Sequence, residues 1–334
     1  MIKDKLQIFL ITYNRYEALK NTLEQILAQD SPIKNYDITI INNASTDGTE
    51  GLILDYQRKF SNIKYTKNPI NIGGNANICR AYELSAAIGK EYSWILCDDD
   101  EFNFSNWKEV EENINLGKDI ICVSNYVFPN AKDFNNKAYQ MFQLTFVPAC
   151  IYKTKNLTDK IMFSMYESIF TMFPQSVLTA SIINDEQSIH VLSKPIIFNG
   201  LHFENKRKNS SFKRGTSKKV ITERKQNETW TLGFVNVISI LKDKKLKKEC
   251  LEVAIPYCDI YGSWLNFYNN LRKLYLNRKN FDYFYEIYKS LKLRRKIEFN
   301  IVNIARFIPV LTALPAWIHS LRVALLIAYH NNKI

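Results

Sequence analysis

The segment Tyr92-Ser93-Trp94-Ile95-Leu96-Cys97-Asp98-Asp99-Asp100 is an apolar run that ends in three carboxylates. The run 93–97 has the length of a buried strand. Adjacent carboxylates repel one another unless a cation lies nearby, and hard oxygen ligands suit Mg²⁺ or Mn²⁺. An acidic turn that caps the next helix is the alternative. In a continuing strand Asp98 and Asp100 point to one side and Asp99 to the other, so the first and third form the natural pair.

Strand and helix signals alternate regularly before this stretch. Strands are predicted at 7–11, 37–41, 63–65 and 93–97, and helices from the apolar stripes within 19–27, 52–60 and 75–88. Strands this apolar, separated by helices, indicate a parallel sheet that is covered on both faces.

The pattern after residue 101 is less regular. Strands are predicted at 119–124, 141–152 and 189–199, a helix between about 158 and 184, and mostly helix from 230 onward. Residues 206–225 hold nine Lys and Arg against one acid, which indicates a flexible basic loop. The prediction is therefore a domain over 1–205, a basic loop over 206–225 and a helical C-terminal region over 226–334.

Positive charge is concentrated in the last third of the chain. The net charge is +12, and residues 206–334 carry 26 basic side chains against 9 acidic ones. A solvated surface, an anionic membrane surface, a diphosphate substrate and nucleic acid are all compatible with this charge.

An apolar segment, 299–329, lies within this basic region. Pro309 and Pro315 lie between Arg306 and Arg322, which leaves too short a run for a spanning helix of about 20 apolar residues. The segment is predicted either to pack on the core or to lie in a membrane interface.

Cysteine usage and the N-terminus bear on the compartment. The six cysteines form no C-x-x-C pair, and most lie in apolar runs. The first apolar run is too short for a signal peptide. We expect a cytoplasmic protein with reduced thiols, held peripherally on the inner face of the cell membrane.

Polar residues follow the predicted strands where each one ends. Thr12-Tyr13-Asn14-Arg15, the run 42–48 and Asp98-Asp99-Asp100 all come directly after apolar runs. Ligands of open parallel sheets bind beyond the carboxyl ends of the strands. These three segments are therefore expected to converge on one edge.

Four segments together carry a family resemblance. They are Thr12-Tyr13-Asn14-Arg15, Ile40-Ile41-Asn42-Asn43-Ala44-Ser45-Thr46-Asp47-Gly48-Thr49, Asn71-Ile72-Gly73-Gly74 with Asn77 and Arg80, and the stretch 92–100. In order and spacing the set resembles the family 2 glycosyltransferases over roughly residues 5–200.

The resemblance implies a GT-A fold, which is a Rossmann-like α/β architecture with a mixed, mainly parallel sheet and helices on both faces. It further implies a nucleotide-sugar donor and a divalent ion, Mn²⁺ or Mg²⁺. Thr12, Tyr13, Asn14, Arg15, Asn42, Asn43, Asp47, Gly73, Gly74, Asn77, Arg80, Asp98 and Asp99 are then expected at the donor, and Asp98, Asp100 and His202 at the metal.

The sequence departs from the family pattern at the nucleoside. Many relatives have an acid at Asn42 or Asn43 that accepts the N3–H of uracil. An asparagine offers an acceptor and a donor, so uridine or thymidine recognition stays open. UDP- or dTDP-sugars are the expected donors. Gly73 and Gly74 either let the backbone approach a phosphate or sugar, or form a simple turn. Arg80 either reaches the donor diphosphate or is a surface charge.

The catalytic base is a second departure. Many relatives open the helix before the last strand with a Glu-Asp pair, but Pro174-Gln175 stands there. Asp185 and Glu186 follow about ten residues later, roughly 15 Å along a helix. Glu167 is nearer and ranks first, with Asp185 and Glu186 behind it. A surface carboxylate is the alternative for each.

His202 and the basic loop follow the last predicted strand of the domain. Some relatives have a histidine here that completes the metal site, although a lone histidine is more often structural. The loop, with Lys206-Arg207-Lys208, is expected either to close over the donor diphosphate or to be a solvated linker.

These expectations define one function and its rivals. The predicted enzyme moves a sugar, with inversion, from a nucleotide sugar to a glycan or lipid-linked acceptor in bacterial surface polysaccharide synthesis. The enzyme is expected to bind the cytoplasmic membrane surface and not to bind nucleic acid. Whether it forms a homo-oligomer is left open. The alternative is a non-catalytic membrane or nucleic-acid adaptor on the same scaffold. A glycosidase would need two carboxylates that flank a sugar, and a sugar nucleotidyltransferase would need a glycine-rich N-terminal loop.

Overall fold

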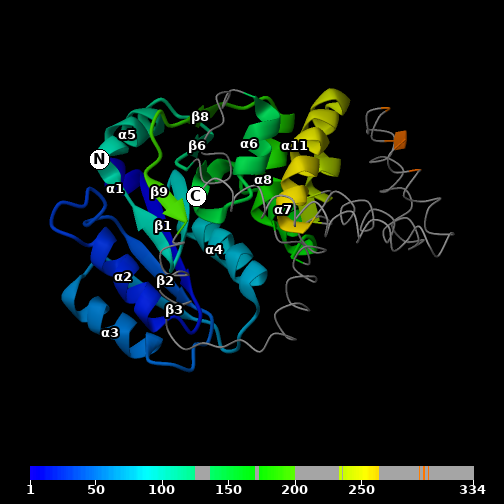
Figure 1. The fold of residues 1–334 in the computed structure, drawn as a ribbon. Coiled ribbons are helices and arrows are strands. Elements are labelled where there is room, and N and C mark those ends of the chain that lie inside the picture. The colour runs from blue at the N-terminus through cyan, green and yellow to red at the C-terminus, as the bar shows by residue number, and fades with distance from the viewer. Residues whose placement is uncertain are drawn as a thin grey trace, which may run out of the picture. The chain divides into compact units, whose positions relative to one another are not determined.

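The structure is a computed structural model that describes residues 1–124, 136–169, 173–199, 233–234, 236–262, 293, 296–297 and 300. Figure 1 shows the order of its elements. The strands are β1 Leu6–Thr12, β2 Ile38–Asn42, β3 Ile63–Lys67, β4 Tyr92–Cys97, β5 Asp100–Phe102, β6 Ile120–Cys122, β7 Cys150–Lys153, β8 Ile189–Val191 and β9 Ile197–Asn199. The helices are α1 Ile2–Lys5, α2 Tyr16–Ile26, α3 Thr49–Lys59, α4 Gly74–Ile88, α5 Trp107–Asn115, α6 Lys137–Gln143, α7 Asp159–Glu167, α8 Gln175–Asn184 and α11 Lys244–Gly262.

Seven of these strands form one mixed sheet in the order β3-β2-β1-β4-β7-β6-β8. The strands β3, β2, β1 and β4 pair in parallel, β7 runs antiparallel between β4 and β6, and β8 is again parallel to β6. β5 and β9 form a separate antiparallel ribbon. The predicted mixed, mainly parallel sheet is confirmed.

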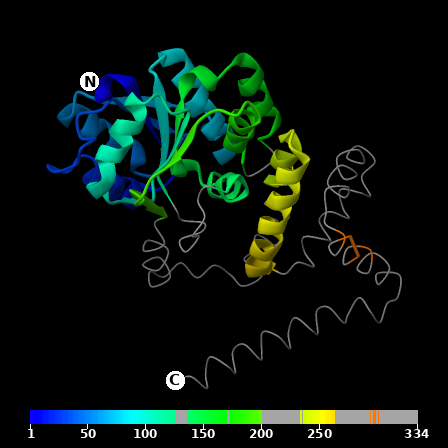
Figure 2. The same cartoon turned by 90° about the horizontal axis from the view of Figure 1, so that it is seen from above.

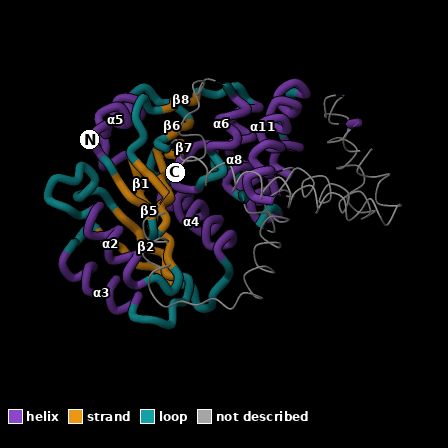
Figure 3. Tube along the Cα trace, viewed as in Figure 1, coloured by secondary structure: helices purple, strands orange, loops and turns teal. Residues whose placement is uncertain are grey.

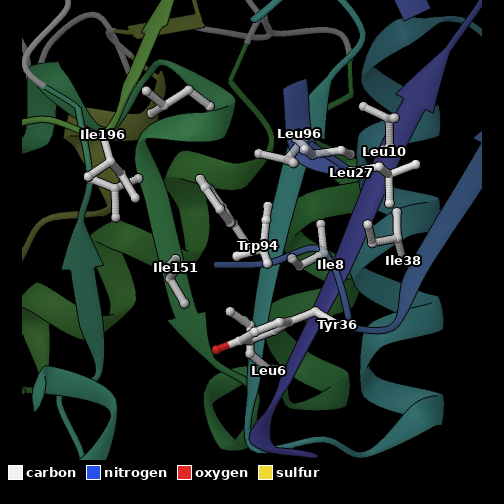
Figure 4. Packing of buried hydrophobic residues seen from close by; sticks show 14 of the residues in the cluster. Leu6, Ile8, Leu10, Leu27, Tyr36, Ile38, Trp94, Leu96, Ile151 and Ile196 are labelled. Carbon is white, nitrogen blue, oxygen red and sulfur yellow. The ribbon is translucent and has the colours of Figure 1, made fainter. Parts of the chain in front are cut away.

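Helices cover both faces because the central strands are apolar on both sides. On one face Ile8 and Leu10 of β1 pack with apolar residues of α2, α3 and α5, and on the other Phe9 packs with those of α4, α7 and α8. Figure 3 shows α2, α3 and α5 on one side of the strands and α4 and α8 on the other. Figure 4 shows the first cluster, in which Trp94 lies close to Ile8.

Three predicted elements differ from the structure. The apolar run 141–152 is not one strand, because it begins in α6, passes through the 3-10 turn Val147–Ala149 and becomes extended only in β7. Periodicity cannot tell a short buried helix from a strand. The predicted strand at 189–199 is two strands, β8 and β9, in different sheets, and the helix predicted over 158–184 is α7 and α8.

The chain divides into two compact units. The first holds 1–216 with 240–242, and the second holds 217–239 with 243–334. α11, yellow in Figure 2, belongs to the second. Within the described residues, no helix combines the length and apolarity needed to cross a membrane. The predicted basic loop 206–225 and the apolar segment 299–329 lie outside the described residues, except for residue 300.

Candidate functional site

The ends of three neighbouring parallel strands meet at one edge of the sheet. Thr12 is paired with Asn42 at the ends of β1 and β2, and Ile11 is paired with Cys97 at the end of β4. The three aspartates follow Cys97 directly. The convergence expected from the sequence is therefore confirmed, and we call this edge the carboxyl edge.

Arg15 and Thr12 hold the first two aspartates. The Arg15 Nη1 atom donates to Asp98 Oδ1 at 2.8 Å and to Asp99 Oδ2 at 2.7 Å. Thr12 Oγ1 donates to the other Asp98 oxygen at 2.7 Å. Both oxygens of the buried Asp98 carboxylate thus have protein donors, whereas one oxygen of Asp99 has none among the described residues.

Asp100 is held differently, and this corrects the expected strand alternation. The residues Asp98 and Asp99 form a turn, and a new strand begins at Asp100. Asp98 and Asp100 are both buried, but Arg15 joins Asp98 to Asp99. The Asp100 carboxylate folds back and accepts the Cys97 N–H at 3.0 Å, its one hydrogen bond among the described residues.

Two side chains of α2 form hydrogen bonds with this turn and with the strand β5 that follows it. Thr22 Oγ1 donates to the carbonyl of Asp98 at 3.1 Å. Gln25 Oε1 accepts the Phe102 N–H at 3.0 Å. In the sequence, the spacing of Thr22 from Leu19 places it on the apolar side of this helix, and in the structure Thr22 is fully buried. No comparable signal in the sequence pointed to Gln25.

Charge at the turn is poorly balanced. Burial raises the pKa of Asp98 to about 6 even though Arg15 acts in the opposite direction. Burial, followed by the charge of Asp99, raises the pKa of Asp100 well above its usual range. Burial works against the charge of Arg15, but Asp98 and Asp99 outweigh it and raise the pKa of Arg15. Among the described residues, one guanidinium thus pairs with two of the three carboxyl groups.

This donor set fits a hard divalent ion. Asp98, Asp99 and Asp100 offer carboxylate oxygens, which Mg²⁺ and Mn²⁺ prefer as ligands. A divalent cation would also offset the excess negative charge of these three side chains. No group of three or more His, Cys, Asp or Glu side chains among the described residues already has the arrangement of a metal site. His202, the predicted third ligand, lies outside the described residues. The carboxylates of the turn could therefore hold a divalent ion only together with further ligands.

The loops after β1 and β2 hold each other. The Asn14 N–H donates to Ser45 Oγ at 2.9 Å, and Asn14 Oδ1 accepts the Thr46 N–H at 2.7 Å. Asp47 accepts the N–H groups of Thr49 at 3.0 Å and Tyr16 at 3.4 Å. Asn14 and Asp47 were both predicted at the donor. In the structure their hydrogen bonds fix the conformation of the two loops.

Two neighbours of these loop residues complete the arrangement. A Cβ at Gly48 would lie 3.2 Å from the Tyr16 ring, which is a tight contact. Tyr13 is exposed beside the loops, at 40% of its full area. Tyr13 is thus the member of the first motif whose ring faces solvent.

Asn42 and Asn43, both predicted at the donor, turn inward and bond within the protein. Asn42 is fully buried, accepts the Ser45 N–H at 2.8 Å and donates to the Tyr65 hydroxyl at 3.3 Å. Asn43 Oδ1 accepts both the Asn68 amide at 2.9 Å and the Ile72 N–H at 3.0 Å. The two acceptor positions of the Asn43 oxygen are therefore filled within the protein.

Asn43 belongs to a network of asparagine side chains. It donates to Asn71 Oδ1 at 2.8 Å, and Asn68 donates to Asn77 Oδ1 at 2.8 Å as well as to Asn43. Asn71 also accepts the Gly73 N–H at 2.8 Å. The network fixes the loop that leads into α4. Sequence reasoning missed Asn68, because an Asn before a proline resembles any turn.

The two glycines at the start of α4 differ. Gly73 has a left-handed φ of 86°, which favours glycine. Gly74 is helical, and a Cβ there would meet nothing within 4 Å. Arg80 lies farther along α4 and pairs with Glu83 at 2.8 Å, with both side chains partly exposed. The structure does not join Arg80 to the aspartates.

Among the base candidates, only Glu167 lies near the start of α4. Glu167 is the exposed last residue of α7, and just beyond it the Ile169 carbonyl accepts the Asn75 amide at 2.9 Å. α4 begins at the carboxyl edge, because Ile72 and Asn77 join the network on Asn43, one residue beyond β2. The structure thus brings the end of α7 to this edge.

Asp185 and Glu186 lie at the opposite edge. They precede β8, whose first residue pairs with the first residue of the parallel strand β6. Asp185 is exposed and pairs with Lys242 at 3.5 Å, and Glu186 is exposed with a left-handed φ of 54°. The structure does not bring either residue to the aspartates. Gln175 does open α8, as predicted, but it is buried and donates to the Thr145 carbonyl at 2.8 Å.

Glu109 was not predicted, yet it positions the ribbon partner of Asp100. It accepts from His190 Nε2 in β8 at 2.7 Å and from Ser193 Oγ, between β8 and β9, at 2.6 Å. Burial raises the pKa of Glu109, but the hydrogen bonds outweigh it and lower the value to about 2. Glu109 thereby ties the segment that leads to β9, which pairs with β5 at Asp100.

A family model and curated relatives match this chain. The model described as Glycosyl transferase family 2 matches residues 7–180, which confirms the resemblance seen in the four motifs. The poly(ribitol-phosphate) beta-glucosyltransferase of Bacillus spizizenii is 24% identical over 55% of this chain and 26% of that protein. The abequosyltransferase RfbV of Salmonella typhimurium is 26% identical over 56% of this chain and 63% of that protein. The chain thus spans less than two thirds of these relatives.

Solved structures share the fold. S. aureus TarS 1–349 in complex with UDP-GlcNAc aligns with a TM-score of 0.52 at 18% identity, over 86% of this chain and 91% of that one. The mannosyltransferase PcManGT from Pyrobaculum calidifontis, in complex with GDP-Man and Mn²⁺, aligns with a TM-score of 0.54 at 12% identity, over 82% and 75%. At these identities the likeness concerns the fold, and it confirms the predicted GT-A architecture.

Proposed function

Because this chain belongs to glycosyl transferase family 2, we propose that it transfers a sugar from a nucleotide-sugar donor to a glycan or lipid-linked acceptor. One observation carries the proposal: of three consecutive aspartates at the edge where parallel sheets bind ligands, Arg15 pairs with Asp98 and Asp99, and buried Asp100 has no ion pair among the described residues. A turn with only a structural role would be expected to balance its buried charges.

Asp98 and Asp100 would hold a divalent ion, Mn²⁺ or Mg²⁺, with His202 as a further ligand. When bound, the ion would neutralise charge on the leaving nucleoside diphosphate. The chain's own residues orient the site: Thr12 fixes the Asp98 carboxylate, and the asparagine network fixes the start of α4. The backbone N–H groups at that helix start favour an anion such as the donor diphosphate.

Glu167 is the proposed base. Its carboxylate would take the proton of the acceptor hydroxyl as the oxygen attacks the anomeric carbon and the nucleoside diphosphate leaves, with inversion. Its place at the end of α7, next to the start of α4, supports this role. Asp185 and Glu186 are not proposed, because they lie at the opposite edge.

UDP- or dTDP-sugars remain the proposed donors, but not through Asn42 or Asn43, whose amides bond within the protein. Backbone groups of the loops after β1 and β2, with the Tyr13 ring, are proposed to hold the nucleoside. A family relative named for transfer to poly(ribitol phosphate) supports a polymer acceptor, and bacterial surface polysaccharide synthesis is the proposed setting.

The C-terminal region is proposed to hold the enzyme on the inner surface of the cell membrane, where a lipid-linked acceptor would be presented. Its support is the sequence alone, 26 basic against 9 acidic residues over 206–334. Co-sedimentation with anionic vesicles should weaken as salt rises. If the protein co-sediments with neither anionic nor neutral vesicles, this part of the proposal is wrong. The alternative role for the region is then to form the interface of a homo-oligomer.

The test is a donor screen with the purified full chain. Thermal shift with UDP, dTDP, GDP and CDP, each with and without Mn²⁺, identifies the nucleotide. Turnover of the matching sugar donors then separates an enzyme from an adaptor. Binding without any release of nucleoside diphosphate, with or without acceptor glycans, would contradict the proposed reaction and favour the adaptor.

A further inference from the structure

Arg15 makes an asymmetric set of contacts. Both of its ion pairs use the same nitrogen, Nη1, which lies 2.8 Å from Asp98 and 2.7 Å from Asp99. A guanidinium has five N–H donors, and the remaining three have no partner among the described residues. Its charge is therefore placed between two carboxylates, where a metal ion would otherwise provide the positive charge.

The surroundings allow the guanidinium to leave without disturbing the carboxylate. The Arg15 backbone is anchored, because its carbonyl accepts the Leu19 N–H at 2.9 Å at the start of α2. The Arg15 side chain is 38% exposed, so it can turn toward solvent. Asp98 would keep its orientation, since Thr12 still donates to its second oxygen at 2.7 Å.

No other cation shares this role in the described part of the chain. Every other Lys or Arg ion pair recorded there is with an acid other than Asp98, Asp99 or Asp100. Asp100 itself is buried and has no ion pair among the described residues. In that part of the chain the three acids therefore divide into a pair that Arg15 neutralises and one without a counter-ion.

We propose that Arg15 is a built-in counter-ion that competes with the divalent ion for Asp98, so that metal binding requires the guanidinium to leave Asp98 and its neighbour Asp99. The proposal rests on the proposed function for the presence of a metal. Competition sets a lower metal affinity than the same carboxylates would have alone, because each binding event must also break the two ion pairs of Arg15.

The experiment measures Mn²⁺ binding directly, without nucleotide or sugar. Free Mn²⁺ is followed by its electron paramagnetic resonance signal during titration of the full-length protein. In Arg15→Gln the dissociation constant for Mn²⁺ should fall about tenfold, since removing the competitor leaves two carboxylates unpaired. Arg15→Lys, which reaches one carboxylate at a time, should lower it about threefold.

Arg58→Gln is the matched control. Arg58 also uses Nη1 to bind an aspartate, Asp55, at 2.9 Å, but on the outer surface of α3. Its Mn²⁺ affinity should stay within about twofold of the wild type. The control separates competition at the site from a general change in protein charge.

An unchanged or weakened affinity in Arg15→Gln would overturn the proposal, because it would mean that Arg15 holds the carboxylates in place for the ion. If circular dichroism shows that this variant is unfolded, the direction of change in Arg15→Lys decides instead. Absence of Mn²⁺ binding in wild type and both variants also overturns it. The proposed function is judged separately, by sugar transfer: tighter Mn²⁺ binding in an inactive protein would keep the counter-ion role and remove the reaction.

Discussion

The two edges of the sheet differ in how their acidic side chains are paired with basic ones. At the amino edge, where the parallel strands begin, acids are matched by lysines: Asp37 binds Lys90 at 2.6 Å, and Asp119 binds Lys155 at 2.9 Å. Glu91 pairs with two lysines there, at 3.3 and 3.7 Å. At the carboxyl edge Arg15 pairs with Asp98 and Asp99, and Asp100 has no ion pair among the described residues.

The pKa shifts follow this difference. The hydrogen bond from Lys90 lowers the pKa of Asp37. For Asp119, burial works against ionisation, but hydrogen bonds from Lys155 and Ser188 outweigh it and lower the pKa. Burial raises the pKa values of Asp98 and Asp100. Acids at the amino edge thus stabilise the fold when ionised, whereas ionised acids at the carboxyl edge are held at a cost that a ligand cation would offset.

The largest expected effect is at Asp100. We expect Asp100→Ala to lower metal-dependent sugar transfer by about a thousandfold, because it removes a proposed ion ligand. Stability should change little, since the lost hydrogen bond to Cys97 is offset by relief of like-charge repulsion. Transfer assays and thermal denaturation of the same sample test both. Transfer at the wild-type rate would remove the carboxyl edge from the reaction.

The next effect separates the base candidates by edge. Glu167→Gln should lower turnover by about a hundredfold with unchanged donor affinity, because the base acts on the acceptor. Asp185→Asn is the matched control at the amino edge and should keep turnover, since Asp185 is exposed and pairs only with Lys242 among the described residues. Turnover is measured by nucleotide release, and donor affinity by calorimetry. The reverse pattern would return the base to the helix end at Asp185.

Sequence reasoning predicted the first hundred residues well, because their apolar runs have unambiguous length and spacing. All four strands and three helices expected before Asp98 are present. The run 141–152 was assigned wrongly, since a buried helix and a buried strand are both apolar on every side. Nothing local in the sequence tells which one its neighbours will require.

Predictions of the site were limited in another way. Spacing placed Thr12, Asn42 and Asp98 at one edge, because parallel strands end together. It could not show that the Asn42 amide bonds to Ser45 and Tyr65, nor that Arg15 contacts Asp99 and not Asp100, because hydrogen-bond partners depend on turns and rotamers. Strand alternation failed at the aspartates because the chain turns there.

A smaller effect, on stability alone, is expected at the amino edge. Asp119→Asn should lower the free energy of unfolding by about 1–2 kcal/mol at neutral pH, because Asp119 is nearly buried and binds both Lys155 and Ser188. Sugar transfer should stay within about twofold of wild type. Urea denaturation and the transfer assay distinguish this from Asp100→Ala. If Asp119→Asn lost sugar transfer without losing stability, the assignment of a structural role to the amino edge and a catalytic role to the carboxyl edge would be wrong.

The smallest effect is the pH dependence of that stability. The folded-state pKa of Asp119 is lowered, so its contribution is complete above the unfolded value of about 4. As pH falls below that value the unfolded chain takes up its proton first, and the contribution is lost as pH passes through the folded value. The difference in unfolding free energy between wild type and Asp119→Asn should therefore be constant from pH 7 to 5 and shrink from pH 4 to 3. Asp55→Asn, on the exposed pair with Arg58, should show a difference near zero throughout. A wild-type advantage that persisted unchanged at pH 3 would mean that packing around Asp119, and not its charge, stabilises the amino edge.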